Sequence, residues 1–194
     1  MMYYSPSNFV GHRINGYKAN VCFLTKAAAE GLKQGQSRLK TIGRARNETL
    51  SLLVRDCYRP KKAVQEFIDW SHNSDTSTKS KYYPDLSKLQ LFTEGYIAPI
   101  SGHSRASTTD LTIVRLSKTG EQEPLPMGTS VDFLGERSHT DDPGISTEEK
   151  KNRQLLKNVL SPEFKNYDKE WWHYTLINEP YPKTLFDFDV ESIK

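Results

Sequence analysis

The chain has 194 residues, of which 36% are hydrophobic and 11% aromatic, as expected for one soluble globular domain over residues 1–194. Its 27 Lys and Arg residues exceed its 24 Asp and Glu residues by only three, and no basic run is interleaved with aromatic residues, so no nucleic-acid partner is expected. No stretch reaches the roughly 20 apolar residues of a membrane span, and the N-terminus lacks the basic and apolar regions of a secretory signal.

The first regular elements expected are a helix and a strand. Residues 24–40, LTKAAAEGLKQGQSRLK, are amphipathic, with Thr25 suited to cap the start and the region of Gly35 marking a weak end. Residues 48–58, ETLSLLVRDCY, form an apolar run rich in strand-forming residues. This run predicts a largely buried strand.

A second helix is expected directly after that strand. In residues 59–70, RPKKAVQEFIDW, apolar side chains recur at helical spacing. Pro60 suits the first helical position, because its missing N–H would have no partner there. A residue that precedes proline is held in extended geometry, so Arg59 should stand at the end of the strand on a fixed backbone.

The middle of the chain contains more loop. Residues 72–81 are polar and unpatterned, which predicts a surface loop. Residues 101–116, SGHSRASTTDLTIVRL, join a Ser- and Gly-containing loop to a strand, and residues 127–146, MGTSVDFLGERSHTDDPGIS, are loop-like. Long loops between elements argue against a regular βαβ fold.

The C-terminal third adds one helix and one strand. Ser146 and Glu149 form a capping box that opens a helix over residues 146–161. Residues 170–177, EWWHYTLI, are aromatic and β-branched enough for a strand. Strands separated by unequal helices and loops predict an α+β fold, with a mainly antiparallel sheet flanked by helices.

The two cysteines, Cys22 and Cys57, have no C-x-x-C partner. We expect buried free thiols, with a disulfide as the alternative in an oxidising compartment. A signal peptide that had been removed would leave the same sequence, so a cytoplasmic and a periplasmic location both stay open.

Among the five histidines, His12 and His72 lie in polar segments and are expected at the surface. His103, Asp110 and His173 offer two imidazoles and one carboxylate, which is the ligand set of an open, catalytic zinc site with water in the fourth position. The alternative is that they are ordinary hydrogen-bonded core or surface groups. Their spacing leaves both interpretations open.

The piece EWWHY raises a geometric condition. Residues three apart point to opposite faces of a regular strand, so Glu170 and His173 share a site only if Glu170 lies on irregular backbone at the strand's start. The tryptophans between them are expected in the core, where packing would also hold the imidazole in one rotamer and limit water.

Several motifs resemble one family. SGHSRASTTDLT resembles the S-x-H-x-x-G-x-A-x-D motif of the zinc D,D-peptidases, and EWWHY resembles their E-x-x-H motif. DCYRP, MGTSVDF with GERSH, the helix near NRQLL, and EPYPKTLFDFDV are similar, more narrowly, to the VanX-type D-alanyl-D-alanine dipeptidases. The motifs occur in order from NFVGHRINGY to FDFDV, so the resemblance covers nearly the whole chain.

The resemblance implies a single compact domain with the hedgehog/D,D-peptidase-like fold and one zinc ion per chain. It implies hydrolysis of D-alanyl-D-alanine to two D-alanines by a metal-bound water, either in glycopeptide resistance or in recycling of cell-wall dipeptides. The roles that it implies are metal ligands at His103, Asp110 and His173, a general acid/base at Glu170, transition-state stabilisation by Arg59, and substrate contacts at Ser101, Asp132 and Tyr17.

The implied substrate contacts follow the charges of a free dipeptide, which carries an ammonium and a carboxylate close together. Asp132 suits the ammonium, and Ser101 and Tyr17 suit the carboxylate. Arg59 could instead form a plain salt bridge to Asp56. A pocket built for both charges rejects longer chains, because capped termini leave its polar groups unpaired.

Two positions depart from the family pattern: Ala106 replaces the motif's glycine, and Thr108 its small residue. If the backbone at 106 has a positive φ, alanine there costs about 1 kcal/mol.

His139 in GERSH is an alternative ligand, although a hydrogen-bonded loop histidine is the expected role. Alternative functions are a D,D-carboxypeptidase or peptidoglycan endopeptidase of the same family, or a zinc-stabilised binding module without catalysis.

Overall fold

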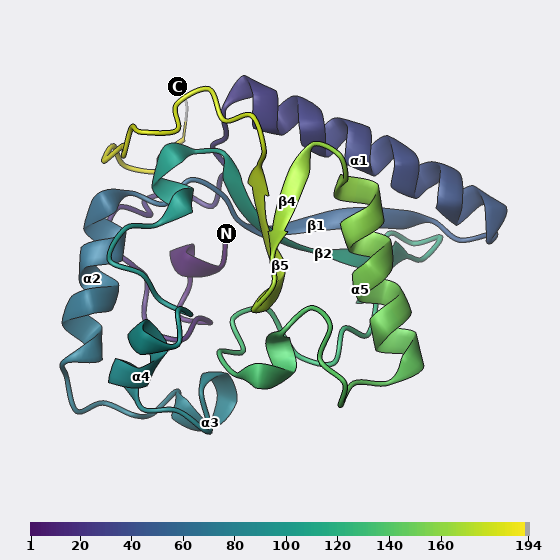
Figure 1. Cartoon of the computed structure of the whole chain (residues 1–194). Coiled ribbons are helices and arrows are strands. Elements are labelled where there is room, and N and C mark those ends of the chain that lie inside the picture. Colours follow the sequence, from purple (N-terminus) through teal and green to yellow (C-terminus); the bar gives the residue numbers. More distant parts are fainter. Residues whose placement is uncertain (193–194) are drawn as a thin grey trace.

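A computed structural model describes residues 1–192 as a mainly antiparallel sheet flanked by helices (Figure 1), which confirms the predicted α+β class. The strand order is β1-β2-β5-β4, and β3 pairs with β2 off this path. Every strand pair in the sheet is antiparallel. The strands are β1 Leu50–Asp56, β2 Thr108–Leu116, β3 Gln122–Pro124, β4 Phe164–Tyr167 and β5 Glu170–Leu176.

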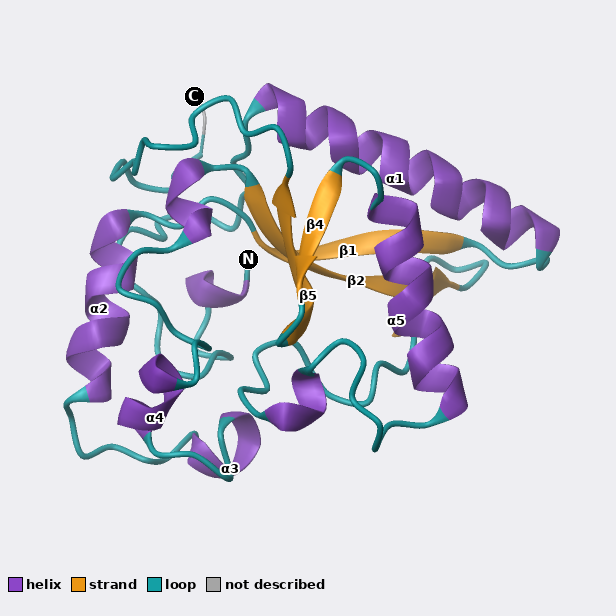
Figure 2. Ribbon diagram, in the orientation of Figure 1, coloured by secondary structure: helices purple, strands orange, loops and turns teal. Residues whose placement is uncertain are grey.

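The helices form two groups. The long helices α1 and α5 pack on each other beside the sheet, while α2, α3 and α4 lie together on the other side of the view (Figure 2). The α-helices are α1 Lys26–Ala45, α2 Lys61–Ser71, α3 Lys79–Tyr82, α4 Lys88–Thr93 and α5 Thr147–Leu160. Three short 3-10 helices cover Met2–Tyr4, Gly102–Arg105 and Glu136–Ser138. Within residues 1–192, none of these helices has the length and apolarity to cross a membrane.

Helix α1 starts as predicted and ends later. The Thr25 side chain accepts a hydrogen bond from the N–H of Ala28, as an N-cap does. The predicted end near Gly35 is wrong, because the helix continues to Ala45. A Cβ on Gly35 would lie 3.0 Å from the carbonyl oxygen of Val159. The glycine therefore serves the close approach of α1 to α5 and is not a helix end.

One of the other two predicted helix starts is shifted by one residue. Pro60, expected at the first helical position, is the N-cap of α2, which begins at Lys61. Ser146 and Glu149 form the expected capping box of α5, with both hydrogen bonds present. The loop predicted over residues 72–81 turns helical at Lys79.

The two cysteines form a disulfide, so the expectation of free thiols is wrong. Cys22 and Cys57 are 35 residues apart in the chain, with their Cα atoms 5.4 Å apart. The segment that precedes α1 runs beside the end of β1, and the N–H of Tyr58 donates to the carbonyl oxygen of Phe23 at 3.0 Å. This pairing of distant segments, which local sequence does not reveal, brings the sulfurs together.

The register of the sheet places polar residues in one row. Asp56 on β1 is opposite Asp110 on β2, and Asp110 is opposite His173 on β5. Trp171 and Trp172, next to His173, are almost fully buried and belong to the main hydrophobic core. Packing of the two tryptophans in the core thus holds β5 in place, with His173 opposite Asp110.

Candidate metal centre and its cavity

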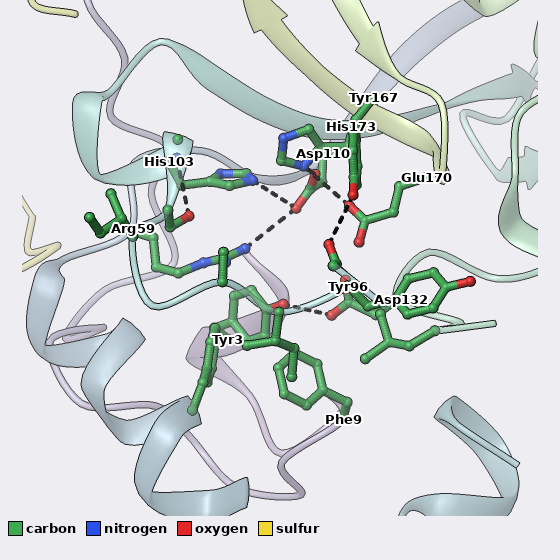
Figure 3. Close-up of a pocket in the computed structure, with 18 residues that line it drawn as sticks. Tyr3, Phe9, Arg59, Tyr96, His103, Asp110, Asp132, Tyr167, Glu170 and His173 are labelled. Atoms are coloured by element: carbon green, nitrogen blue, oxygen red, sulfur yellow. Dashed lines mark hydrogen bonds and ion pairs between the residues drawn. The ribbon is translucent and has the colours of Figure 1, made fainter. Parts of the chain in front are cut away.

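Three side chains from two strands and a 3-10 helix converge on one point (Figure 3). Nδ1 of His173 lies 3.1 Å from Oδ1 of Asp110, and Nε2 of His103 lies 3.3 Å from Oδ2 of the same carboxylate. One ligand atom from each residue lies within 4.8 Å of the others. The set predicted from sequence is therefore close enough to hold one metal ion.

The hydrogen bonds of His103 test whether a cation fits. Nδ1 of His103 lies 2.6 Å from the carbonyl oxygen of Cys57, which can only accept, so Nδ1 carries the proton. In the neutral ring, Nε2 then presents a lone pair to the carboxylate of Asp110. His103 Nε2 and Asp110 Oδ1 are buried without a hydrogen-bond partner among residues 1–192. A cation between these atoms would resolve the repulsion, and two imidazoles with one carboxylate suit zinc.

Electrostatics favour the protonation states that a metal requires. Burial alone would raise the pKa of Asp110, but His103 and His173 beside it hold that pKa well below its usual range. Burial lowers the pKa of His173, despite the nearby carboxylate of Asp110. Asp110 is therefore charged and His173 is biased towards the neutral form.

Glu170 satisfies the geometric condition set by its spacing from His173. It is the first residue of β5, and the β4–β5 register shifts between Asn166 and Tyr167, beside the pair Tyr167–Glu170. Oε2 of Glu170 consequently lies 3.4 Å from Nδ1 of His173. Burial, followed by repulsion from Asp110, raises the pKa of Glu170 well above its ordinary value. A buried carboxyl group with a raised pKa is suited to accept a proton and return it.

Arg59 forms the salt bridge that was its alternative role and also faces the cavity. Its Nε and Nη2 donate to Oδ2 of Asp56 at 3.1 and 3.0 Å, and Nη2 lies 3.6 Å from Oδ2 of Asp110. Asp56 is fully buried, and the sequence had indicated it only as a salt-bridge partner of Arg59, not as a site residue. It stands immediately before the CYRP stretch, so its position in that motif was the available signal.

The cavity beside these residues has a volume of about 250 Å³, which suits a small molecule. Ser101 and Asp132, for which the resemblance implies substrate contacts, line it, and so do Arg59 and Glu170. Its other walls are largely apolar or aromatic, formed by Tyr3, Phe9, Phe67, Tyr96, Ile97, Ala98, Ile100, Leu134 and Tyr167.

Tyr17 is not among the residues that line this cavity, contrary to its predicted contact with substrate. It is buried, and its hydroxyl donates to Oδ1 of Asp56 at 2.8 Å. A different tyrosine, Tyr3, lies in the cavity wall and donates to Oδ2 of Asp132 at 2.7 Å (Figure 3). Sequence analysis missed Tyr3, because only the folding back of the first 3-10 helix brings it to Asp132.

Asp132 is held in an uncommon conformation. Its φ is 63°, in the left-handed region, and its side chain is buried. Burial, followed by repulsion from Asp110, raises its pKa to about 7. Asp132 can therefore offer a negative charge to a cationic group, but only when the pH is high enough.

The remaining histidines lie outside the group. Nε2 of His139 is 2.9 Å from the hydroxyl of Tyr96, as expected of a hydrogen-bonded loop histidine. His12 is exposed and pairs with Glu66, and His72 is exposed.

Ala106, which follows the 3-10 helix of His103, has a φ of 56°, so the strain anticipated for a motif without its glycine is present.

Comparisons with known proteins agree with the geometry. A family model of the M15 peptidases, described as D-ala-D-ala dipeptidase, matches residues 1–191. A D-alanyl-D-alanine dipeptidase of Enterococcus faecalis is 43% identical over 190 residues, covering 97% of this chain and 90% of the relative. Proteins of the same name from Enterococcus faecium and Streptomyces coelicolor are 41% and 39% identical, with the same coverage.

Proposed function

This chain belongs to the M15 peptidase family of D-Ala-D-Ala dipeptidases, and on that premise we propose that it hydrolyses D-alanyl-D-alanine to two D-alanines with one zinc ion. The observation that carries the proposal is the convergence of His103, Asp110 and His173 beside a cavity that Glu170 and Arg59 also line.

The three converging side chains would hold the zinc. When bound, zinc supplies a Lewis acid and lowers the pKa of a coordinated water towards about 7. The Cys57 carbonyl keeps the proton of His103 on Nδ1, which leaves Nε2 free for the metal. The position of Asp110 between two imidazoles keeps it charged.

Glu170 would move the proton. Its carboxylate lies within 3.4 Å of a ligand nitrogen of His173, so it is beside the reacting atoms and is not itself needed as a ligand. A buried carboxylate with a raised pKa takes a proton from the attacking water and gives it to the leaving amine. A purely structural metal needs no such group, which argues against a non-catalytic binding module.

Arg59 would stabilise the negative charge that develops on the scissile carbonyl oxygen. Its salt bridge to Asp56 fixes the guanidinium, and its Nη2 remains near Asp110 at the metal side of the cavity. A cation that is positioned before the reaction needs no reorganisation during it.

The charges of the cavity favour a free dipeptide over a longer chain. The carboxylate of Asp132, held by Tyr3, would receive the substrate's ammonium group. Ser101 lines the cavity next to His103 and would contact the substrate's other end. An acylated amino terminus would leave the buried carboxylate of Asp132 without a cationic partner, which is a strong basis for rejecting stem peptides.

The decisive experiment combines metal analysis with assays on matched substrates. The purified protein should contain one zinc per chain and release D-alanine from D-Ala-D-Ala. We expect no release from L-Ala-L-Ala and little from a cell-wall pentapeptide that ends in D-Ala-D-Ala. Preferred cleavage of the pentapeptide would favour a D,D-carboxypeptidase, whereas zinc binding without hydrolysis of either substrate would favour a binding module.

A further inference from the structure

We propose that the Cys22–Cys57 disulfide positions the metal site, so that its reduction weakens metal binding and slows turnover. The part that concerns turnover rests on the proposed hydrolysis, whereas the part that concerns metal binding rests only on the convergence of His103, Asp110 and His173. The disulfide lies outside the group of metal ligands, and its influence would pass through the backbone.

The first link is direct. Cys57 supplies the carbonyl oxygen that accepts from Nδ1 of His103, at 2.6 Å. The same short segment carries Asp56 on one side and Arg59 on the other, and the N–H of Arg59 donates to the carbonyl of His103 at 3.3 Å. The Cys57 segment and the His103 helix are therefore connected in both directions, and a shift of Cys57 would rotate or release the imidazole.

The second link joins the Cys22 segment to the other side of the site. The N–H of Thr25 donates to the carbonyl of Ala106 at 2.7 Å, and the hydroxyls of Thr25 and Ser107 are 3.0 Å apart. Residues 22–25 thus contact both the segment that precedes Arg59 and the strained turn that follows His103. The disulfide fastens this irregular segment to the end of β1.

The bond is open to reductants at one end. Cys22 is exposed, whereas Cys57 is only 1% exposed. A phosphine reductant can attack the disulfide at Cys22, the exposed residue of the pair, which breaks the S–S bond and releases the thiolate of Cys57. Water then hydrolyses the phosphonium, giving phosphine oxide and two protein thiols, so two electrons pass from phosphorus to the disulfide. An oxidising compartment would keep the bond closed and the site fully formed.

The expected loss is moderate, because the ligands themselves remain. Some groups do not bind the metal but form hydrogen bonds to its ligands and orient them. Their removal typically lowers metal affinity or activity by about 10- to 100-fold. Reduction would loosen the Cys57 carbonyl without removing it. The expected loss of zinc affinity is therefore near the lower end of that range, about tenfold. A role confined to global stability would lower the melting temperature and leave metal affinity unchanged.

The test compares oxidised protein, the same protein reduced with a phosphine, and the variant C22S/C57S. We would measure thiols per chain, the Kd for zinc by chelator competition, the visible spectrum of the Co²⁺-substituted protein, and kcat/KM for D-Ala-D-Ala. Reduction should expose two thiols, raise the Kd about tenfold, alter the Co²⁺ bands and lower kcat/KM. C22S/C57S should behave like the reduced protein and should not respond to the phosphine.

Arg38→Ala provides the matched control for global destabilisation. Arg38 on α1 bonds to the carbonyl of Val159 and to Glu163, away from the metal site, so its loss should lower the melting temperature without changing the Kd for zinc. The proposal is overturned if reduction leaves the Kd for zinc and the Co²⁺ spectrum unchanged, or if Arg38→Ala raises that Kd as much as reduction does. It is also overturned if protein purified without reductant already has two free thiols per chain. If C22S/C57S does not fold, reduction of the intact chain still decides.

Discussion

Asp110 and His173 face each other across the β2–β5 ladder, with Nδ1 of the imidazole 3.1 Å from Oδ1 of the carboxylate. Two of the three candidate ligands are therefore placed by backbone pairing in a buried sheet. The third, His103, comes from a 3-10 helix and depends on the carbonyl of Cys57 for its orientation. The ligands therefore differ in what holds them: strand pairing holds Asp110 and His173, and one backbone carbonyl orients His103.

Glu170→Gln should bind zinc as the wild type does but lose nearly all hydrolysis. The amide is nearly isosteric but cannot accept the proton of the attacking water, and proton transfer by such a group contributes about 10²- to 10⁴-fold. Metal analysis and kcat for D-Ala-D-Ala check this. Turnover at the wild-type rate would remove Glu170 from the mechanism, and loss of zinc would make it a ligand.

Arg59→Lys should lower kcat about a hundredfold or more with little change in KM. Lysine keeps the charge but cannot donate from two nitrogens to Asp56, so the cation is no longer fixed. Arg105→Lys is the control, because Arg105 forms an equivalent two-nitrogen pair with Glu179 and does not line the cavity. Equal losses in both variants would contradict a specific role for Arg59.

Asp132→Asn should raise KM much more than it lowers kcat. The wild-type KM should rise as the pH falls below about 7, because protonation removes the charge that receives the ammonium group. The KM of Asp132→Asn should lack this dependence. Asparagine tolerates the left-handed backbone at this position, so the fold should survive. A wild-type KM that is flat between pH 6 and 8 would argue against this contact.

The same substitution has a defined effect on stability in the metal-free protein. Folding raises the pKa of Asp132 from an unfolded value of about 4 to about 7, so the folded state holds this proton more tightly. Its contribution therefore becomes unfavourable as the pH rises through that window. Asp132→Asn should thus be more stable relative to wild type at pH 8 than at pH 4.5, as measured by urea unfolding with zinc removed.

Ala106→Gly should stabilise the protein. Ala106 has a φ of 56°, where its Cβ is strained, whereas glycine adopts this conformation readily. Relief of that strain should exceed the entropy that glycine adds to the unfolded chain, for a gain of about 0.5–1 kcal/mol in the free energy of unfolding. Ala45→Gly, at the C-terminal end of α1, is the opposite control and should destabilise. A loss of stability in Ala106→Gly would mean that burial of its methyl group dominates.

Local signals in the sequence were enough for much of the fold. The Thr25 cap, the capping box of Ser146 and Glu149, and the strand at EWWHY each depend on neighbours within four residues, and each is present in the structure. The constraint on Glu170 also followed from local geometry alone, since alternation along a strand is a property of the backbone.

Contacts between distant segments were decided by the tertiary structure. Tyr3 rather than Tyr17 reaches the cavity, and Cys22 meets Cys57, because the N-terminal segment packs across the end of β1. Helix α1 passes Gly35 because α5 lies against it, which no helix propensity encodes. Residue types and the family motifs were enough to propose which side chains could bind a metal and move a proton. Which of them lie within bonding distance was determined only by the packing of the whole chain, because such distances depend on contacts far apart in sequence.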